Sequence, residues 1–186
     1  GLIELPKDSA HWSITLLFIL MAYLLSFWVR LEWIEFAQAS YVDETGEVQY
    51  LRPDMLRNGV ALPNTHDSFY FGSILQKGHL GMHEGNHLIP SVLEKGMITY
   101  LPYLLLKFFP SLDIEFLLLW LPVYVAGFVC IPIVLIGRLY GSSLWGLFAA
   151  CLAGITHSYY NRTLAGYYDT DMFSITIPAF ALYFLV

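Results

Sequence analysis

An uncharged run at residues 12–29, WSITLLFILMAYLLSFWV, decides the fold of this chain. Charged residues flank the run on both sides: Lys7 and Asp8, and Arg30 and Glu32. The run covers about 18 residues, close to the ~20 that a helix needs to cross a hydrocarbon core of about 30 Å. A secretory signal would have a shorter apolar core, followed by small residues at a cleavage site. We therefore predict an uncleaved membrane-spanning helix.

The composition of the whole chain agrees with a membrane protein. Of its 186 residues, 57% are hydrophobic and 13% are charged, whereas soluble domains average about 45–50% apolar and about 25% charged residues. The net charge of -6 argues against a nucleic-acid partner, because the phosphate backbone favours clustered Lys and Arg. Cys130 and Cys151 lie inside apolar runs, so no loop offers a disulfide framework.

Three further apolar runs follow in the C-terminal part. The clearest, residues 116–137, is about 22 residues long, and its two prolines are tolerated in membrane helices whose neighbours satisfy the freed carbonyls. A third run ends near Tyr160, and a fourth begins at Met172 and is still apolar at Val186. Because its roughly 15 residues are too few to span, we expect the chain to be cut inside this helix. The first residue, Gly1, points the same way, since a translated chain would begin with Met.

Residues 31–115 hold most of the charge and predict a water-facing loop with short helices. Within it, the apolar residues 97–112 are interrupted by prolines and a lysine, which favours an interfacial or re-entrant segment over a span. The loop also carries several turn signals: Gly46, Pro53, Asn58-Gly59 and Pro63-Asn64. The predicted organisation is therefore 1–30 for the N-terminus and first span, 31–115 for the first external loop, and 116–186 for spans two to four.

Alternating spans place loop 31–115 and the short loop 161–171 on one side of the membrane. The N-terminus and Arg138 then lie on the other side. The positive-inside rule supports this assignment only faintly, because long loops escape it. Our hypothesis is a cytoplasmic N-terminus.

The densest polar cluster is residues 159–171, YYNRTLAGYYDTD. Residues i and i+2 of an extended segment point to the same side, so Asp169 and Asp171 would present hard oxygen ligands of the kind that Mg²⁺ or Mn²⁺ prefers. Two carboxylates do not complete such a site, and a third must come from elsewhere. The alternative is that the tyrosines form an aromatic belt and that Asp169, Thr170 or Asp171 caps a helix beginning at Met172.

The other candidate acid is Asp67, which lies among aromatic residues in the first loop, on the side of the membrane predicted for Asp169. Its alternative role is that of a turn or cap aspartate that starts a short helix at Ser68. Its neighbours His66 and Ser68 do not make a hydrolase triad, because a triad is defined by geometry in the fold.

Two further patterns are weaker. The spacing of His79, His83 and His87 would put them on one helix face, but three glycines interrupt that segment, so a metal site there is the lesser interpretation. Asn161, with Arg162 and Thr163, matches a glycosylation acceptor pattern. It lies too near the membrane for that role, and we interpret it as part of the polar site.

Residues 158–163, SYYNRT, and 166–172, GYYDTDM, together closely resemble the second acidic motif in the catalytic subunit of asparagine-linked oligosaccharyltransferases. The bacterial single-subunit form is the most similar. The layout also resembles that family: one span, a long external loop with an early acidic motif (here His66-Asp67-Ser68), two more spans, and then the second motif.

The resemblance implies an all-α polytopic membrane protein with a glycosyltransferase C type fold, here its N-terminal part with about four transmembrane helices. The implied reaction moves a glycan from a polyprenyl-pyrophosphate carrier to the asparagine side-chain amide of an Asn-x-Ser/Thr sequon. The implied partners are the lipid-linked oligosaccharide, an acceptor protein or peptide, and membrane lipid. The implied location is the bacterial inner membrane, with the active site facing the periplasm.

The resemblance also assigns roles to individual residues. Asp67 matches an acid that ligates a divalent metal, Mn or Mg, and engages the acceptor amide. Asp169 matches the metal-binding acid of the second motif, and Asp171 is its partner. Arg162 matches an arginine that supports the site. Asn161 and Tyr168 lie in the vicinity of the donor or acceptor.

The family's later catalytic carboxylate and its tryptophan-rich sequon-binding domain have no counterpart, and no Trp-Trp-Asp occurs in this chain. We therefore expect these 186 residues alone to be inactive. Other interpretations remain. One is a non-catalytic membrane protein, such as a transporter fragment or a structural subunit, although a transporter should bury ionisable groups in its spans. Another is a different polyprenyl-donor glycosyltransferase of the same fold.

Overall fold

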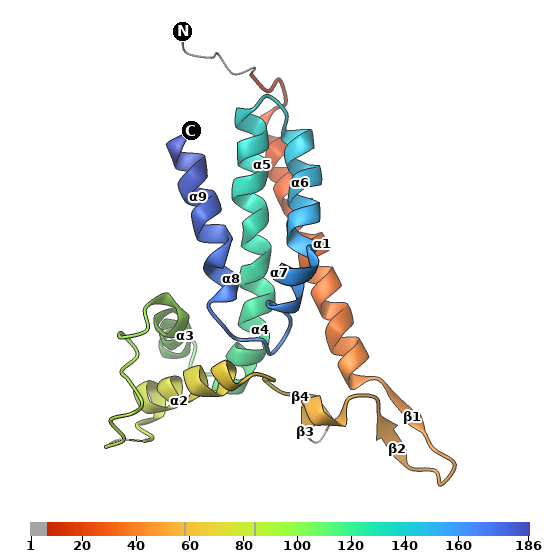
Figure 1. Ribbon diagram of the computed structural model, residues 1–186, viewed down its shortest axis with the longest axis vertical. Helices are drawn as coiled ribbons and strands as arrows, with labels where there is room; N and C mark the ends of the chain where they lie inside the picture. Colours follow the sequence, from red (N-terminus) through yellow and green to blue (C-terminus); the bar gives the residue numbers. More distant parts are fainter. Residues whose placement is uncertain (1–6, 58, 84) are drawn as a thin grey trace. The chain divides into compact units, whose positions relative to one another are not determined.

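The computed structural model describes residues 7–57, 59–83 and 85–186 (Figure 1). Gly1, and Asn58 of the predicted Asn58-Gly59 turn, lie outside the described residues. The described chain is mostly helical and divides into two compact units. Unit 1 contains residues up to Glu32, Val123–Thr163 and Asp171–Val186, and unit 2 contains Trp33–Pro122 and Leu164–Thr170.

The first predicted span forms helix α1, Trp12–Gln38, which is 27 residues long. It is long and apolar enough to cross a membrane. The helix extends beyond the uncharged run, through Arg30 and Glu32. Arg30 does not end the helix because its guanidinium is fully buried among hydrogen-bond acceptors.

The second predicted span is also confirmed as a helix of spanning length. The α-helix α4, Ile114–Ala126, passes through a turn of 3-10 helix, η2, Gly127–Val129, into α5, Cys130–Leu139. Together they make an apolar helical stretch of 26 residues. As expected in a membrane helix, neither Pro122 nor Pro132 interrupts it.

The third and fourth apolar runs are divided into shorter helices. These are α6, Ser143–Ile155; α7, His157–Asn161; α8, Asp171–Ser174; and α9, Thr176–Leu185. The third run breaks at Thr156, whose backbone turns to ψ 129 and whose hydroxyl donates to the Leu152 carbonyl at 2.8 Å. Such a local side-chain bond competes with the helix ladder.

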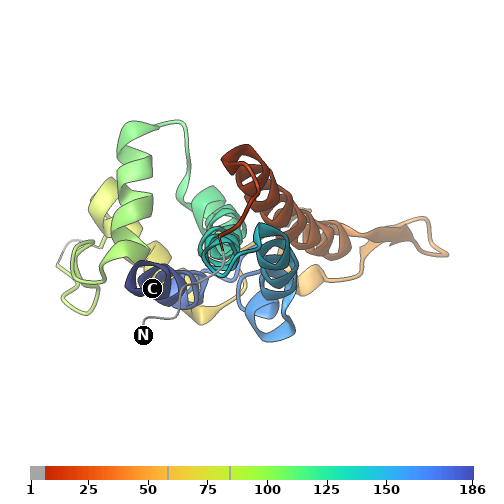
Figure 2. The ribbon, with the colours of Figure 1, turned by 90° about the horizontal axis from the view of Figure 1, so that it is seen from above.

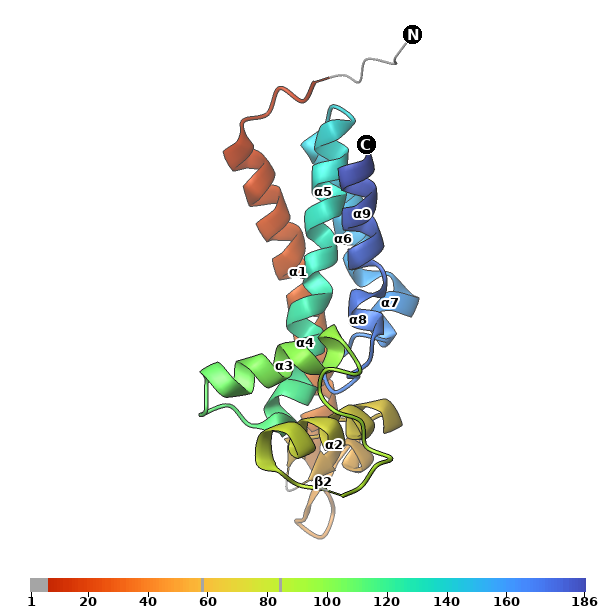
Figure 3. The same cartoon turned by 90° about the vertical axis from the view of Figure 1, so that its left-hand side faces the viewer.

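In unit 1, α5 packs closely against α6 and also lies beside α9 (Figures 2 and 3). Two glycines allow the close approach: a Cβ on Gly137 would lie 2.4 Å from Gly146 Cα, and one on Gly146 would lie 2.7 Å from the Val134 carbonyl oxygen. Small residues of this kind let the backbones of membrane helices pack directly. The core of this unit is apolar, with the buried residues Ala22, Ala126, Val129, Cys130, Val134, Leu147, Ala150 and Tyr159.

Unit 2 contains the predicted external loop, which has more regular structure than the turn signals indicated. Strands β1, Ser40–Val42, and β2, Val48–Tyr50, form an antiparallel ribbon, with Ser40 opposite Tyr50. A 3-10 turn, η1, Pro53–Met55, leads to a second ribbon, in which β3, Leu56–Arg57, pairs with β4, Val60–Ala61.

Two α-helices complete unit 2. Helix α2, His66–Leu80, ends at Gly81, whose φ of 66° is the left-handed conformation common after helices. Helix α3, Met97–Phe108, continues through the buried Pro102, so the proline does not break it. Its 12 residues are too few to cross a hydrocarbon core, in line with the predicted non-spanning segment.

Candidate functional site

The first acidic motif lies at the start of α2. Thr65 caps this helix, since its hydroxyl oxygen accepts a hydrogen bond from the Ser68 amide at 3.0 Å. The alternative role of Asp67 as the cap is therefore wrong. Asp67 lies in the first turn, exposed, and its carboxylate has no hydrogen bond or ion pair with the described residues. Both of its oxygens are thus available to a ligand.

The neighbour of Asp67, the buried Ser68, connects the two predicted acidic motifs. Its hydroxyl donates to the Gly166 carbonyl at 2.9 Å and accepts from the Tyr168 amide at 2.9 Å. The bonded residues Ser68 and Tyr168 are 100 positions apart in the sequence. Asp67 precedes Ser68 and Asp169 follows Tyr168, so this contact joins the two backbone segments that carry the predicted metal ligands within unit 2.

Gly166 makes this close approach possible. Its φ is +80°, and a Cβ at this position would lie 2.8 Å from the Leu62 carbonyl oxygen. Its own amide donates to the Leu119 carbonyl at 2.9 Å, while its carbonyl also accepts from the Asn64 amide at 3.1 Å. A side chain here would require both a strained backbone and displacement of the segment before α2.

The Tyr168 side chain anchors the second motif in the interior of unit 2. Its side chain is fully buried, and its hydroxyl donates to the Ile98 carbonyl. Its ring packs edge-to-face against the Phe71 ring, with 5.9 Å between the ring centroids. Burial raises the pKa of this phenol. Tyr168 therefore lies close to the candidate site through its backbone, whereas its side chain is enclosed by unit 2.

Asp169 is partly buried and partly engaged. Its Oδ1 accepts from the Thr170 amide at 2.6 Å and from the Thr170 hydroxyl at 3.1 Å. Its Oδ2 has no hydrogen-bond partner among the described residues. Oδ1 of Asp169 therefore stabilises the local turn, and Oδ2 is available to a ligand.

The remaining predicted residues belong to unit 1. Arg162 Nη1 lies 2.9 Å from Asp171 Oδ2, and the two side chains are 61% and 23% exposed. Asp171 is the first residue of α8. The Nδ2 of the exposed Asn161 lies 3.1 Å from His157 Nε2. The structure thus joins Arg162 to Asp171, as a pair that water can reach.

Arg30 is a residue that the sequence reasoning treated only as a flank. It is fully buried in unit 1, and its guanidinium donates to acceptors from three segments. Nη1 donates to the Ser26 hydroxyl at 2.7 Å and to the Gly154 carbonyl at 2.9 Å, and Nη2 donates to the Thr163 hydroxyl at 2.7 Å. The rings of Tyr159 and Tyr160 lie 5.5 Å from the guanidinium carbon.

These contacts fix Thr163, the residue after Arg162, against α1 and the end of α6. Arg30 is therefore a positioning residue for the start of the second motif. The one signal in the sequence was a serine four residues before an arginine at the end of an apolar run.

Two of these residues carry donor atoms that suit a divalent metal. Asp67 and Asp169 supply unpaired carboxylate oxygens, the donors that Mg²⁺ and Mn²⁺ prefer. Among residues 7–57, 59–83 and 85–186, no group of three or more His, Cys, Asp or Glu side chains is arranged to hold a metal ion. The three histidines do not share a helix face, because α2 ends at Leu80 and His83 has a φ of 59°.

Comparison with known proteins shows which proteins this chain is similar to. Residues 95–186 match the family model "Oligosaccharyl transferase STT3, N-terminal". The chain is 32% identical over 168 residues to the undecaprenyl-diphosphooligosaccharide–protein glycotransferase of Campylobacter jejuni serotype O:2, and equally to that of strain RM1221. The alignment covers 90% of this chain and 21% of each relative, so the chain spans about a fifth of their length. Residues 95–186 are therefore similar to the N-terminal part of STT3 oligosaccharyl transferases, and most of the chain is similar to about a fifth of the two glycotransferases.

Proposed function

We propose that this chain forms the N-terminal membrane portion of an oligosaccharyltransferase. The enzyme would transfer a glycan from a polyprenyl-pyrophosphate carrier to the side-chain amide of asparagine in an Asn-x-Ser/Thr sequon. The observation that supports the proposal is the Ser68 contact, which joins the segment that carries Asp67 to the segment that carries Asp169, although they come from distant parts of the sequence. The printed names of the relatives, which describe transfer from an undecaprenyl-diphospho-oligosaccharide to protein, support it.

The chemistry explains why an unpaired carboxylate is needed. An amide nitrogen is a poor nucleophile because its lone pair is delocalised into the carbonyl. Asp67, with both oxygens available, would accept hydrogen bonds from the acceptor NH₂ and turn it out of conjugation with its carbonyl. Asp67 lies in the first turn of α2, at the positive end of the helix dipole.

The leaving group is a lipid pyrophosphate, on which negative charge develops. A bound Mn²⁺ or Mg²⁺ would neutralise part of that charge. Asp67 and Asp169 would hold the ion, with Asp171 as the partner acid that the resemblance assigns. Arg162, oriented by Asp171, would place a guanidinium toward the pyrophosphate oxygens.

The proposal includes the wider setting. We infer a multi-pass protein of the bacterial inner membrane with four spans in this portion, of which α1 and Ile114–Leu139 have spanning length by themselves. Residues 31–115 and 161–171 would face the periplasm. The later carboxylate and the sequon-binding domain would come from other parts of the enzyme.

Glycosylation of a sequon peptide by the full-length protein tests this function. We expect Asp67→Asn and Asp169→Asn to lower the rate at least about 100-fold, because each removes a charge that acts on the reacting groups. Asp54→Asn is the matched control, since Asp54 is an exposed acid of unit 2 that pairs with Arg52. Binding of Mn²⁺, followed by electron paramagnetic resonance, should weaken in the first two variants and not in the control.

Two results would contradict the proposal. Wild-type rates in both Asp67→Asn and Asp169→Asn would reject the site and favour a non-catalytic membrane protein. Sequon glycosylation by the purified 186-residue chain alone would show that no further carboxylate or domain is required.

A further inference from the structure

A second polar site lies in unit 1, lined by the start of α1 and the C-terminal parts of α5 and α9. Figure 1 shows these helix ends at the opposite end of unit 1 from α7 and α8. The site is a pocket of about 330 Å³, within the range of small-molecule sites. Two cations, two amphipathic aromatic residues and two leucines line it: Lys7, Arg138, Trp12, Tyr183, Leu135 and Leu139. The proposed glycosyl transfer uses none of these residues.

Arg138 is held in place on one side only. Its Nη1 donates to the Thr15 hydroxyl at 2.6 Å and to the Ala10 carbonyl at 2.9 Å. Its guanidinium carbon lies 4.1 Å from the centre of the Trp12 ring. Nε and Nη2 make no hydrogen bond to the described residues, so two sides of the guanidinium fork remain available to an acceptor.

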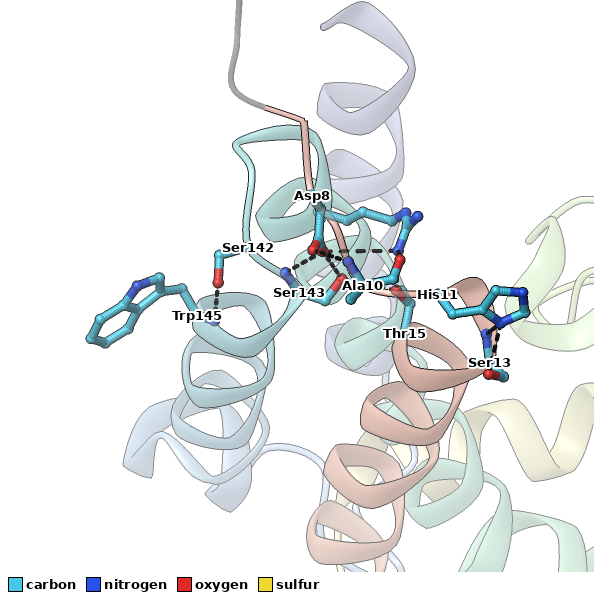
Figure 4. Close-up of polar contacts among 9 residues, drawn as sticks. Asp8, Ala10, His11, Ser13, Thr15, Ser142, Ser143 and Trp145 are labelled. Carbon is cyan, nitrogen blue, oxygen red and sulfur yellow. Dashed lines mark hydrogen bonds and ion pairs between the residues drawn. The ribbon is translucent and has the colours of Figure 1, made fainter.

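The acid of the pocket, Asp8, is directed toward α6. Figure 4 shows its carboxylate at the start of that helix, where Oδ2 accepts from the Ser143 amide at 2.7 Å and from the Ser143 hydroxyl. The Ser143 hydroxyl, the Ala10 amide and Arg138 hold the pKa of Asp8 below its ordinary value. Asp8 Oδ2 also lies 3.8 Å from Arg138 Nη1, so it pairs with the same nitrogen that Thr15 and Ala10 engage. A second anion would therefore bind at Nε and Nη2 of Arg138.

The pocket lies at the level where the two long apolar helices end. Trp12 is the first residue of α1, and Leu139 is the last residue of the stretch Ile114–Leu139. Trp and Tyr are enriched where such helices meet lipid headgroups, and basic pockets between membrane helices bind anionic headgroups. The leucines below the cations provide an apolar wall that a free inorganic anion would not need.

We propose that this pocket binds an anionic phospholipid. The phosphate lies between Lys7 Nζ and the open edge of the Arg138 guanidinium, and the Tyr183 hydroxyl is within the same lining. The first methylenes of the acyl chains run along Leu135 and Leu139. Among the described residues that line the pocket, two cations stand against one carboxylate, that of Asp8, which is already engaged, and this balance favours an anionic lipid over a zwitterionic one.

The test measures lipid binding by the full-length protein in neutral detergent. Dioctanoyl phosphatidylglycerol, dioctanoyl phosphatidylcholine and sodium phosphate are each titrated by calorimetry, so no glycosylation assay is involved. We expect phosphatidylglycerol to bind at least about fivefold more tightly than phosphatidylcholine, and Lys7→Gln to weaken it about fivefold. Lys107→Gln is the matched control, because Lys107 is an exposed lysine at the end of α3, outside the pocket.

A second variant guards against a folding defect. Arg138→Lys keeps the positive charge and loses the planar guanidinium, so it should also weaken the binding of phosphatidylglycerol. The melting temperature of this variant is measured to confirm that it folds. Equal affinities for the two lipids, or wild-type affinity in Lys7→Gln, would overturn the proposal. Sodium phosphate that competes as well as phosphatidylglycerol would overturn it too, since the acyl contacts would then contribute nothing.

Discussion

At the scale of single residues, Arg30 shows how a charge is accommodated inside an apolar helix without a counter-ion. No carboxylate among the described residues pairs with it. Its acceptors are hydroxyl and carbonyl oxygens, and one of them, the Gly154 carbonyl, lies in the last turn of α6. Carbonyls at that position lack intrahelical partners and carry the negative end of the helix dipole. The carbonyl groups at the end of α6 therefore stabilise the positive charge of Arg30, as the carboxylate of an ion pair would.

Replacing this residue should be costly. We predict that Arg30→Met lowers the free energy of unfolding by about 3 kcal/mol, because several buried acceptors lose a charged donor at once. Arg57→Met is the comparison, since the Arg57–Glu115 pair is 3.4 Å long and 60% and 67% exposed, and we expect a change within about 0.5 kcal/mol. Thermal unfolding in detergent measures both, and equal shifts would show that the Arg30 network contributes little.

Asp43 provides a pH-dependent contact in unit 2. Its carboxylate accepts from the Thr45 hydroxyl at 2.6 Å, from Gln49 Nε2 at 3.0 Å and from the Glu47 amide at 3.0 Å. These bonds lower the pKa of Asp43 to about 2, with the Thr45 hydroxyl as the largest cause. A lowered pKa means that the carboxylate stabilises the β1–β2 ribbon above the unfolded pKa of about 3.9.

This contribution should be lost as pH falls through about 2. Hydrogen exchange at the Thr45 and Glu47 amides, followed from pH 5 to pH 2, should therefore lose protection in the wild type beyond the ordinary pH dependence of exchange. In Asp43→Asn, protection should be low throughout and should show no such transition. A wild-type profile parallel to that of Asp43→Asn would contradict the assignment.

At the scale of elements, the first turn of α2 combines a local helix cap with hydrogen bonds to a segment far away in the sequence. Thr65 caps the helix and Ser68 bonds to residues 166 and 168, so the exposed Asp67 between them is left without a structural role. We predict that Ser68→Ala lowers the glycosylation rate of the full-length protein about 10- to 100-fold, because it loosens the segment that carries Asp169.

Ser73→Ala is the control on the same helix, because the Ser73 hydroxyl is exposed and only bonds back to the Phe69 carbonyl. Hydrogen exchange at residues 166–168 gives a readout that does not need activity. Faster exchange in Ser68→Ala and unchanged exchange in Ser73→Ala is the expected pattern. Unchanged exchange in both would show that the Ser68 contact does not hold the segment.

The elements that the sequence predicts best are those set by membrane thickness. The length and purity of the apolar runs predict α1 and the stretch Ile114–Leu139. The end of α1 was missed, because burial of Arg30 depends on acceptors that lie 124 and 133 positions further on. The break at Thr156 was missed because it rests on one side-chain hydrogen bond. The ribbons of unit 2 are too short for a periodic pattern to reveal.

In the candidate site, too, some residues could be predicted from the sequence and others could not. Residue type and resemblance named Asp67, Asp169, Arg162 and Asp171, since a carboxylate or guanidinium is visible in the sequence itself. Neither Ser68 nor Arg30 could be assigned a role, because each acts through contacts with a segment about 100 or more positions away.

At the scale of the whole molecule, the topology gives a direct prediction. With a cytoplasmic N-terminus, a cysteine at Ser142→Cys should resist an impermeant maleimide added to intact cells, whereas one at Thr45→Cys should react. Thr45 lies in the turn between β1 and β2, and Ser142 is the cap residue before α6. The parent protein is the control for background labelling, because its Cys130 is buried and its Cys151 is partly buried. Labelling of Ser142→Cys from outside would reverse the assignment.

The buried Arg30 also constrains the order of events during biosynthesis. An arginine at the centre of an inserting helix costs about 2.5–3.5 kcal/mol, and less near an end from which it can reach water. Its acceptor Thr163 is made 133 residues later, on the order of ten seconds at ribosomal speed. Until then this cost favours a position of the guanidinium near the membrane surface, so we expect the first helix to insert less deeply before Thr163 is made than after it.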